Sequence, residues 1–82
     1  MYETIQQPID VLVAFSKDKV QPKVFRWQNQ KYHIKDIHLI HSAKRGQSHI
    51  YYFSVSYNTQ YFKISFDSTM LTWMLEEVYM EG

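Results

Sequence analysis

The chain has 82 residues with a formal net charge of +1, 17% aromatic residues and no cysteine. A chain of this length hides only about 60–65% of its unfolded surface, so we expect one small domain over residues 1–82 and no second core. The missing cysteines exclude a disulfide framework and thiolate chemistry, which suits a cytoplasmic protein. The longest wholly apolar run, Val11 to Phe15, is too short to cross a bilayer, so we expect no membrane partner.

The first strand is expected after a short lead-in. Residues 1–7 show no period, and we expect them to be loosely ordered up to Pro8. Alternation then places Ile9, Val11, Val13 and Phe15 on one face, which predicts a strand over residues 9–16. Residues 17–21 are expected to form a charged loop, and Pro22 fits the entrance of the next strand, where a missing N–H does least harm.

The clearest signal in the chain is a hairpin over residues 23–37. Phe25 and Trp27 share one face of its first arm, and Tyr32 and Ile34 share one face of its second. A two-residue turn at positions 29 and 30 would pair Trp27 with Tyr32 and Phe25 with Ile34. Gln is a poor substitute for glycine at the second position of such a turn, so a four-residue loop remains an alternative.

The apolar phase changes after this hairpin. Tyr32 and Ile34 are even-numbered, whereas Ile37 and Leu39 are odd-numbered. One extra residue near position 35 or 36 must therefore be absorbed as a β-bulge or a bend. Such a shift lets one long strand serve two sides of a barrel. The polar stretch from Ser42 to Ser48 is expected to be an exposed, mobile loop.

A second hairpin is expected with its turn at Asn58 and Thr59. This turn pairs Val55 with Phe62, Phe53 with Ile64 and Tyr51 with Phe66, so one face is apolar and the other mostly polar. The end of the chain is ambiguous. Residues 70–78 have helical spacing of their apolar members, but Trp73, Leu75 and Tyr79 also alternate as in a strand, which we prefer.

Several of these aromatic positions together resemble a known family. Phe25-Arg26-Trp27, Tyr32-His33-Ile34, Tyr51-Tyr52, Tyr61-Phe62-Lys63-Ile64 and Trp73-Met74-Leu75 are similar to positions in short, uncharacterised bacterial domains often encoded beside or fused to Y-family translesion DNA polymerases. The resemblance covers roughly residues 9 to 80 and carries no catalytic motif. It leads us to expect a glycine in the first turn, where this chain has Asn29-Gln30.

Charge is unevenly distributed along the chain. All nine basic residues lie between Lys17 and Lys63, where only Asp18 and Asp36 are acidic, so this span carries +7 and the remaining six acids give −6. One interpretation is a basic face that contacts phosphates, with tyrosines that stack on bases. The candidate nucleic-acid-binding residues are Arg26, Lys31, Lys44, Arg45, Lys63, Tyr52 and Tyr61. The alternative is that acidic end strands lie against the basic hairpins and neutralise them.

The sequence carries no nucleophile elbow and no glycine-rich phosphate loop, so we do not expect an enzyme. His38 and His41 would point to opposite faces of a strand and lack further ligands, so we expect no metal and no cofactor.

Together these patterns predict an all-β domain of five or six antiparallel strands. We expect it to form a small barrel or a strongly bent sheet, with a C-terminal element that is a strand or else a helix. Its expected role is a binding module for single-stranded or duplex nucleic acid. The alternative is a module that binds a protein partner or a second copy through a strand edge or an aromatic patch.

Overall fold

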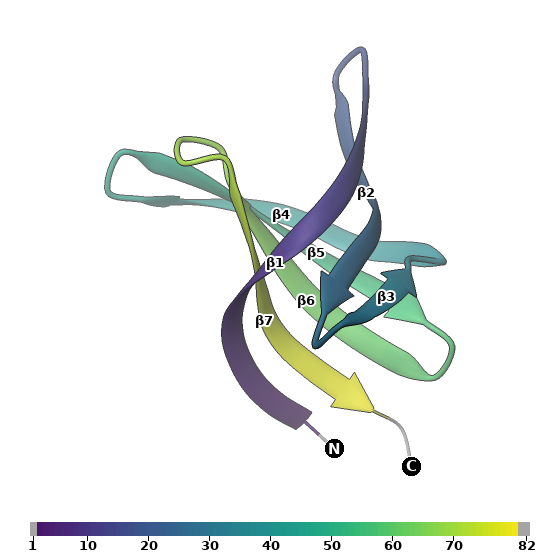
Figure 1. Cartoon of the computed structure of the whole chain (residues 1–82). Coiled ribbons are helices and arrows are strands. Elements are labelled where there is room, and N and C mark those ends of the chain that lie inside the picture. Colours follow the sequence, from purple (N-terminus) through teal and green to yellow (C-terminus); the bar gives the residue numbers. More distant parts are fainter. Residues whose placement is uncertain (1, 81–82) are drawn as a thin grey trace.

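The structure is a computed structural model that describes residues 2–80, which form β-strands joined by short turns and, at Ile34 and Lys35, by a two-residue link. The strands are β1 (Tyr2–Ser16), β2 (Lys19–Trp27), β3 (Gln30–His33), β4 (Asp36–Arg45), β5 (Ser48–Tyr57), β6 (Gln60–Asp67) and β7 (Thr72–Met80). They form one antiparallel sheet in the order β3-β2-β1-β7-β6-β5-β4 (Figure 1). In this part of the chain, no helix is long and apolar enough to cross a membrane. The predicted all-β class is confirmed.

The strand count is seven, not five or six, because one expected long strand is divided. The backbone N–H of Ile34 donates to the carbonyl oxygen of Lys23 in β2, at 2.9 Å. The next N–H, that of Lys35, donates to the carbonyl oxygen of Ser56 in β5, also at 2.9 Å. Two successive residues therefore bond to opposite halves of the sheet. We call this point the corner; here β3 ends and β4 begins.

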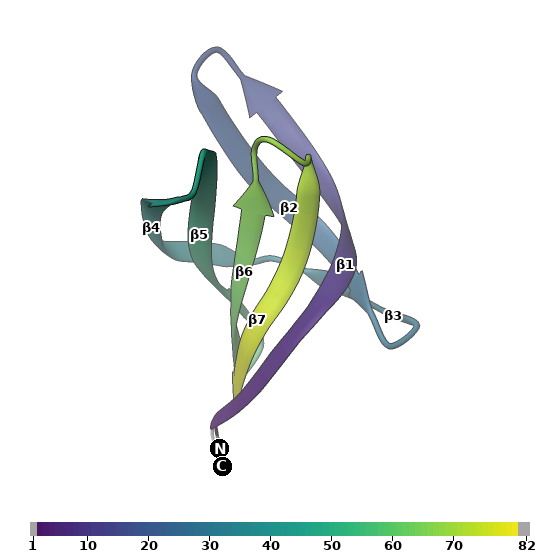
Figure 2. The same ribbon diagram turned by 90° about the vertical axis from the view of Figure 1, so that its left-hand side faces the viewer.

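The sheet is strongly curved but open, so the closed barrel that we considered is not formed. Its two edge strands, β3 and β4, are neighbours in the sequence, so the sheet must curl until its edges meet at the corner. Away from the corner the edges diverge, and no ladder joins β4 to β2 or β3 within residues 2–80 (Figure 2). The curled sheet buries a single core on its inner face, formed by Ile9, Phe25, Tyr32, Phe53, Val55, Phe62, Ile64, Phe66, Trp73, Leu75 and Val78.

The first hairpin has the predicted faces but a different register. Gln28 and Asn29 form its turn, with φ of 53° and 60°, so the turn lies one residue earlier than expected. Phe25 consequently pairs with Tyr32 and Trp27 with Gln30. Two successive positive φ angles are those of the type I′ turn, which matches the twist of the strands. A register shift of two residues leaves each side chain on its predicted face.

The second hairpin has the predicted register throughout. Val55 pairs with Phe62, Phe53 with Ile64 and Tyr51 with Phe66. Asn58 has a φ of 54°, which this residue tolerates better than most.

Two expected loops are mostly strand. Lys17 and Asp18 alone form the turn between β1 and β2, and positions 46 and 47 alone form the turn between β4 and β5. Gly46 supplies a φ of 62° there. The residues beside these turns continue as paired strands, and each hairpin extends beyond the rest of the sheet.

A bulge in β4 corrects the predicted phase of that strand. The register shifts between Ile37 and Leu39, so Ile40 pairs with Phe53 and Leu39 with Ser54. Ile37 and Ile40 therefore share the inner face, and Leu39 faces outward. The sequence pattern had grouped Ile37 with Leu39 instead.

The C-terminal element is the strand β7, not a helix. Its register shifts at Glu76, because Lys63 pairs with Glu77 and Ile64 with Leu75. The buried residues of the strand are therefore Trp73, Leu75 and Val78. A bulge thus produces the uneven spacing that resembled a helix, and it turns Tyr79 outward.

The residues that we expected to be loosely ordered before the first strand belong to β1 from Tyr2 onward. Tyr2 pairs with Tyr79 and Ile9 with Trp73, with a register shift between Thr4 and Gln7. The irregular pairing explains the missing period in this stretch, because a shift in register interrupts the alternation of faces. Met1 lies outside the described residues.

Candidate functional site

Two hairpin ends extend beyond the sheet as two-stranded arms. The first arm consists of residues 13–22, from β1 and β2. In this range β1 no longer pairs with β7, and β2 no longer pairs with β3. The second arm, residues 43–49 of β4 and β5, extends beyond the last pair of β5 with β6. The arms diverge from the body of the sheet (Figure 1). Two-stranded ribbons are marginally stable alone, so arms of this kind are available to a partner.

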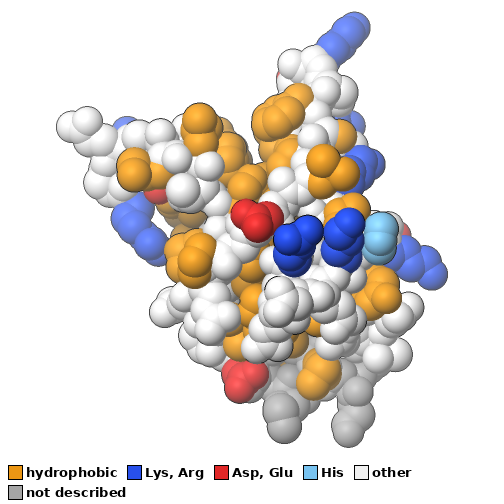
Figure 3. Space-filling model, in the orientation of Figure 1, with side chains coloured by type: hydrophobic (Ala, Val, Ile, Leu, Met, Phe, Trp, Pro, Cys, Tyr) orange, Lys and Arg blue, Asp and Glu red, His pale blue; other side chains and the backbone are white. Residues whose placement is uncertain are grey.

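A cleft of about 630 Å³ lies between the first arm and β4. Its volume is within the range of roughly 300–1,000 Å³ that is typical of ligand pockets. The floor is apolar, and hydrophobic side chains also lie on both sides of the notch in the molecular surface (Figure 3). The lining residues are Asp18, Lys19, Val20 and Gln21 from the first arm, Ile37 and Ile40 from β4, and Tyr51, Phe53, Phe66 and Ser68 from the floor.

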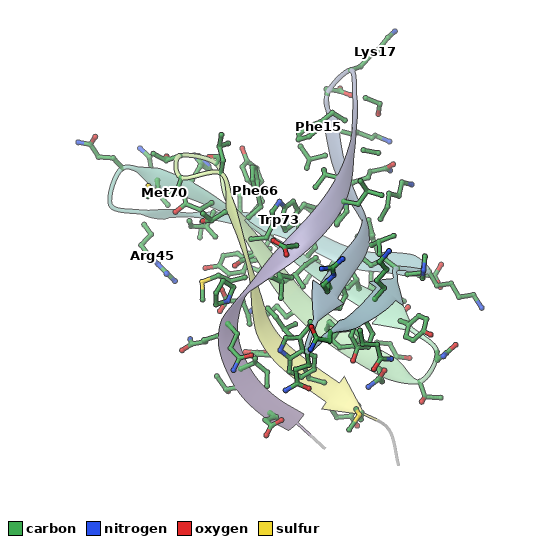
Figure 4. All side chains as sticks on the ribbon, in the orientation of Figure 1. Phe15, Lys17, Arg45, Phe66, Met70 and Trp73 are labelled. Atoms are coloured by element: carbon green, nitrogen blue, oxygen red, sulfur yellow. The ribbon has the colours of Figure 1, made fainter. Side chains whose placement is uncertain are left out.

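The apolar surface continues outward along the first arm. Phe15 pairs with Val20, so the two side chains share the face that borders the cleft. Phe15 is 72% exposed. Figure 4 shows it above Phe66 and Trp73, with Met70 on the opposite side of the notch. A large exposed phenyl ring beside an apolar cleft is a feature of a binding surface.

Free strand edges border the cleft on both sides. Among residues 2–80, positions 19–22 of β2 pair only with β1, and β4 pairs only with β5. Nearly every residue of β4 is exposed, including Leu39 at 56% and Ile40 at 55%. An exposed edge with apolar side chains is a template for pairing with another chain.

The two arms beside the cleft are basic. Lys17 and Lys19 on the first arm are opposed by Asp18, whereas Lys44 and Arg45 on the second arm have no acidic residue within the arm. The arms therefore carry a net charge of +3, more than the +1 of the whole chain.

The predicted nucleic-acid-binding residues do not form a single basic face. Arg26 and Lys31 are paired across β2 and β3, and Asp10 of β1 pairs with Arg26 on the other side. This row lies on the outer face of the sheet, opposite Phe25. Arg45 and Lys63 lie on β4 and β6, at the other side of the sheet.

A second group surrounds Tyr52. The guanidinium of Arg45 donates a 3.3 Å hydrogen bond to the hydroxyl of Tyr52. His41 of β4 stacks on the Tyr52 ring at 4.8 Å, and the ammonium of Lys63 in β6 lies 5.1 Å from its centroid. Since β4 and β6 flank β5 on opposite sides, both faces of the ring are already in contact. Tyr52 is thus the centre of a cluster with Arg45, His41 and Lys63.

The remaining two candidates lie elsewhere. Tyr61 is on the outer face, 5.8 Å from the ring of His38 and 6.2 Å from that of Tyr79. Lys44 pairs with His49 and so lies on the opposite face of the second arm from Arg45. Of the seven candidates, Arg45, Tyr52 and Lys63 are brought together, and Lys44 alone is on the face of the cleft.

The registers also favour neutralisation of the basic hairpins by the end strands. Asp10 of β1 lies across from Arg26, and Glu77 of β7 lies across from Lys63. Directly opposed charges on neighbouring strands attract each other. Two of the five candidate cations thus have an acidic neighbour within the sheet.

The cleft itself was not predicted from the sequence. Its residues were assigned either to the core, as Phe53 and Phe66 were, or to a loop, as Val20 and Gln21 were. One sequence feature could have indicated the cleft: the apolar face of the first strand continues to Phe15, near the end of the first arm.

No group of three or more His, Asp or Glu side chains within residues 2–80 is arranged to hold a metal ion. Comparisons of the chain with protein-family models, with curated proteins and with solved structures find no match.

Proposed function

We propose that this protein is a non-catalytic protein-interaction module that binds an extended segment of a partner in the cleft between the first arm and β4. One observation carries the proposal: an apolar cleft is bordered by unpaired strand edges on both sides. A partner strand can satisfy the free N–H and C=O groups of an edge while its alternate side chains enter the cleft.

The sides of the cleft suit a peptide. Val20, Ile37 and Ile40 on the two sides of the cleft are aliphatic, and they suit the aliphatic side chains of a strand. Lys19, which lines the cleft, and Lys44, which lies on its face, can pair with acidic residues of a partner.

Leu39 and Ile40 provide a matched test. The two residues are adjacent, are exposed to nearly the same extent, and face opposite sides of β4. Peptides selected from a random displayed library would be titrated against Ile40→Asp and Leu39→Asp. We expect Ile40→Asp to weaken binding by about tenfold or more, because a charge is placed against the apolar cleft, and Leu39→Asp to bind normally. Equal effects of the two substitutions, or no selected peptide, would overturn the proposal.

A second candidate function is binding of single-stranded nucleic acid in the same cleft. It is favoured by the +3 charge of the arms and by Tyr51, which stacks on His49 at 5.6 Å and lines the cleft. The resemblance to domains encoded beside DNA polymerases supports it as well. Titration of a labelled thymidine oligonucleotide at increasing salt tests it, since binding to phosphates weakens steeply with ionic strength. An affinity that does not change with salt would exclude this candidate.

A further inference from the structure

We infer that the partner bound in the cleft is a second copy of this chain, and that Phe15 on the first arm of each copy inserts into the cleft of the other. This inference rests on the proposed function and names the partner of the same site.

The apolar face of the first arm begins in the core and ends in solvent. The register pairs Val13 with Pro22 and Phe15 with Val20, so these four side chains share one face. Pro22 is fully buried at the base of the arm, Val13 and Val20 are partly buried against the core, and Phe15 is 72% exposed. Within residues 2–80, the body of the sheet therefore covers this face only near its base.

The cleft offers exposed apolar side chains on its floor and on the side opposite the first arm. Tyr51 of the floor and Ile40 of β4 are exposed, and both line the cleft. Met70 is also exposed and lies across the notch from Phe15 (Figure 4). A layer inserted between the first arm and β4 would therefore bury apolar surface on more than one side.

The first arm of a second copy fits this space. Two layers of strands whose apolar faces meet pack about 10 Å apart with interdigitated side chains. When a two-fold axis relates the copies, the two arms run in opposite directions, so the tip of one lies over the base of the other. Phe15 of each copy then lies over the floor of its partner's cleft, beside Tyr51 and Phe66. One contact, made twice, covers both exposed rings.

The charges around the cleft allow two copies to approach. Asp18 and Lys19 are the charged residues that line the cleft, and they have opposite signs. In a two-fold interface, Asp18 of one copy can pair with Lys19 of the other, and the reciprocal pair forms at the same time. Lys44 adds one positive charge on the face of the cleft, and the whole chain carries only +1. Such a small net charge gives little repulsion between copies.

Phe15 and Leu12 provide a matched test. Both are large exposed residues of β1, at 72% and 67%, but Leu12 pairs with Val24 on the outer face of the sheet. Sedimentation velocity of the full chain would be measured from micromolar to millimolar concentration. We expect a monomer–dimer equilibrium whose dissociation constant rises by about tenfold or more for Phe15→Asp, because a charge then meets the apolar floor. Leu12→Asp should dimerise normally.

A mixture of two variants tests where Phe15 inserts. Phe15→Asp retains an unaltered cleft, whereas Ile40→Asp retains the ring of Phe15 but places a charge in the cleft. Each variant alone should be mostly monomeric. Their mixture can form one unaltered contact between ring and cleft, so we expect more dimer in the mixture than in either variant alone. No gain on mixing would overturn the insertion of Phe15 into the partner's cleft.

The outcomes separate this inference from the proposed function. A monomer at every concentration, or equal effects of Phe15→Asp and Leu12→Asp, would overturn the second copy as the partner, whereas the library selection judges the cleft as a peptide site. A selected peptide should dissociate the dimer, because the peptide and the arm occupy the same cleft. A dimer that remains intact with the peptide bound would place the second copy outside the cleft and overturn the inference.

Discussion

Phe25 of β2 stacks on Tyr32 of β3, with ring centroids 5.0 Å apart and ring planes within 14° of parallel. Phe62 of β6 meets both rings nearly edge-on, at 5.0 Å from Phe25 and 5.1 Å from Tyr32. Of these three strands, only β2 and β3 are neighbours in the sheet. The aromatic cluster therefore holds the two halves of the curled sheet against each other.

Removal of Phe25 should be the most costly change in the first hairpin. Phe25 is 1% exposed, whereas Trp27, which was predicted to share its face, is half-buried and donates a 2.9 Å hydrogen bond from its ring N–H to the exposed Gln7. We predict that Phe25→Ala lowers the free energy of unfolding by about 3–5 kcal/mol, a large part of the roughly 5–10 kcal/mol available to a small domain. Trp27→Ala should cost less. Urea denaturation of both variants measures this, and a larger loss for Trp27→Ala would contradict the packing described.

Two turn positions should respond to substitution with opposite signs. Leu71 has a φ of 57° and is 73% exposed, so it is strained without a compensating contact in the core. Leu71→Gly should raise the free energy of unfolding by about 0.5–1 kcal/mol, and Gly46→Ala, at a φ of 62°, should lower it by a similar amount. Open space surrounds a Cβ at position 46, so only the backbone contributes to that loss. Thermal unfolding of both variants is the measurement; a stabilising Gly46→Ala would refute the assignment of the turn.

The opposed charges of Lys63 and Glu77 should be interchangeable. Lys63→Glu places two acids directly across from each other and should lower the free energy of unfolding by about 0.5–1 kcal/mol. The double exchange with Glu77→Lys should recover most of this loss, except for the part that belongs to the contact of Lys63 with the ring of Tyr52. A double-mutant cycle at low and high salt measures the coupling. Additive effects of the two substitutions would show that the opposed charges do not interact.

Hydrogen exchange should distinguish the arms from the body of the sheet. β5, β6 and β7 each have strand neighbours on both sides, whereas the first and second arms are two-stranded. We predict that backbone amides of Phe53 and Ile64 exchange only on global unfolding, and that those of residues 13–22 and 43–49 exchange through local opening. Two-dimensional NMR in D₂O measures both sets. Protection of the arms equal to that of Ile64 would mean that they are not independent of the sheet.

The sequence by itself determined the local elements. Alternation along residues 49–66 defined the second hairpin with its register, and alternation around Phe25 and Tyr32 identified the inner face of the first. Both results follow from the two-residue period of a strand, because an apolar face can point in only one direction if a core is to form. The two inner faces of these hairpins make up much of the core.

Only the tertiary structure decided where the ladders end and where the sheet remains open. The turn at Gln28, the bulges in β4 and β7 and the corner at Ile34 and Lys35 depend on pairing between segments distant in the sequence, which local periodicity does not report. The cleft arises from the same cause. Residues such as Val20 and Ile40 become its lining because two edges that meet at the corner then separate, and no pattern within either strand records the distance between them.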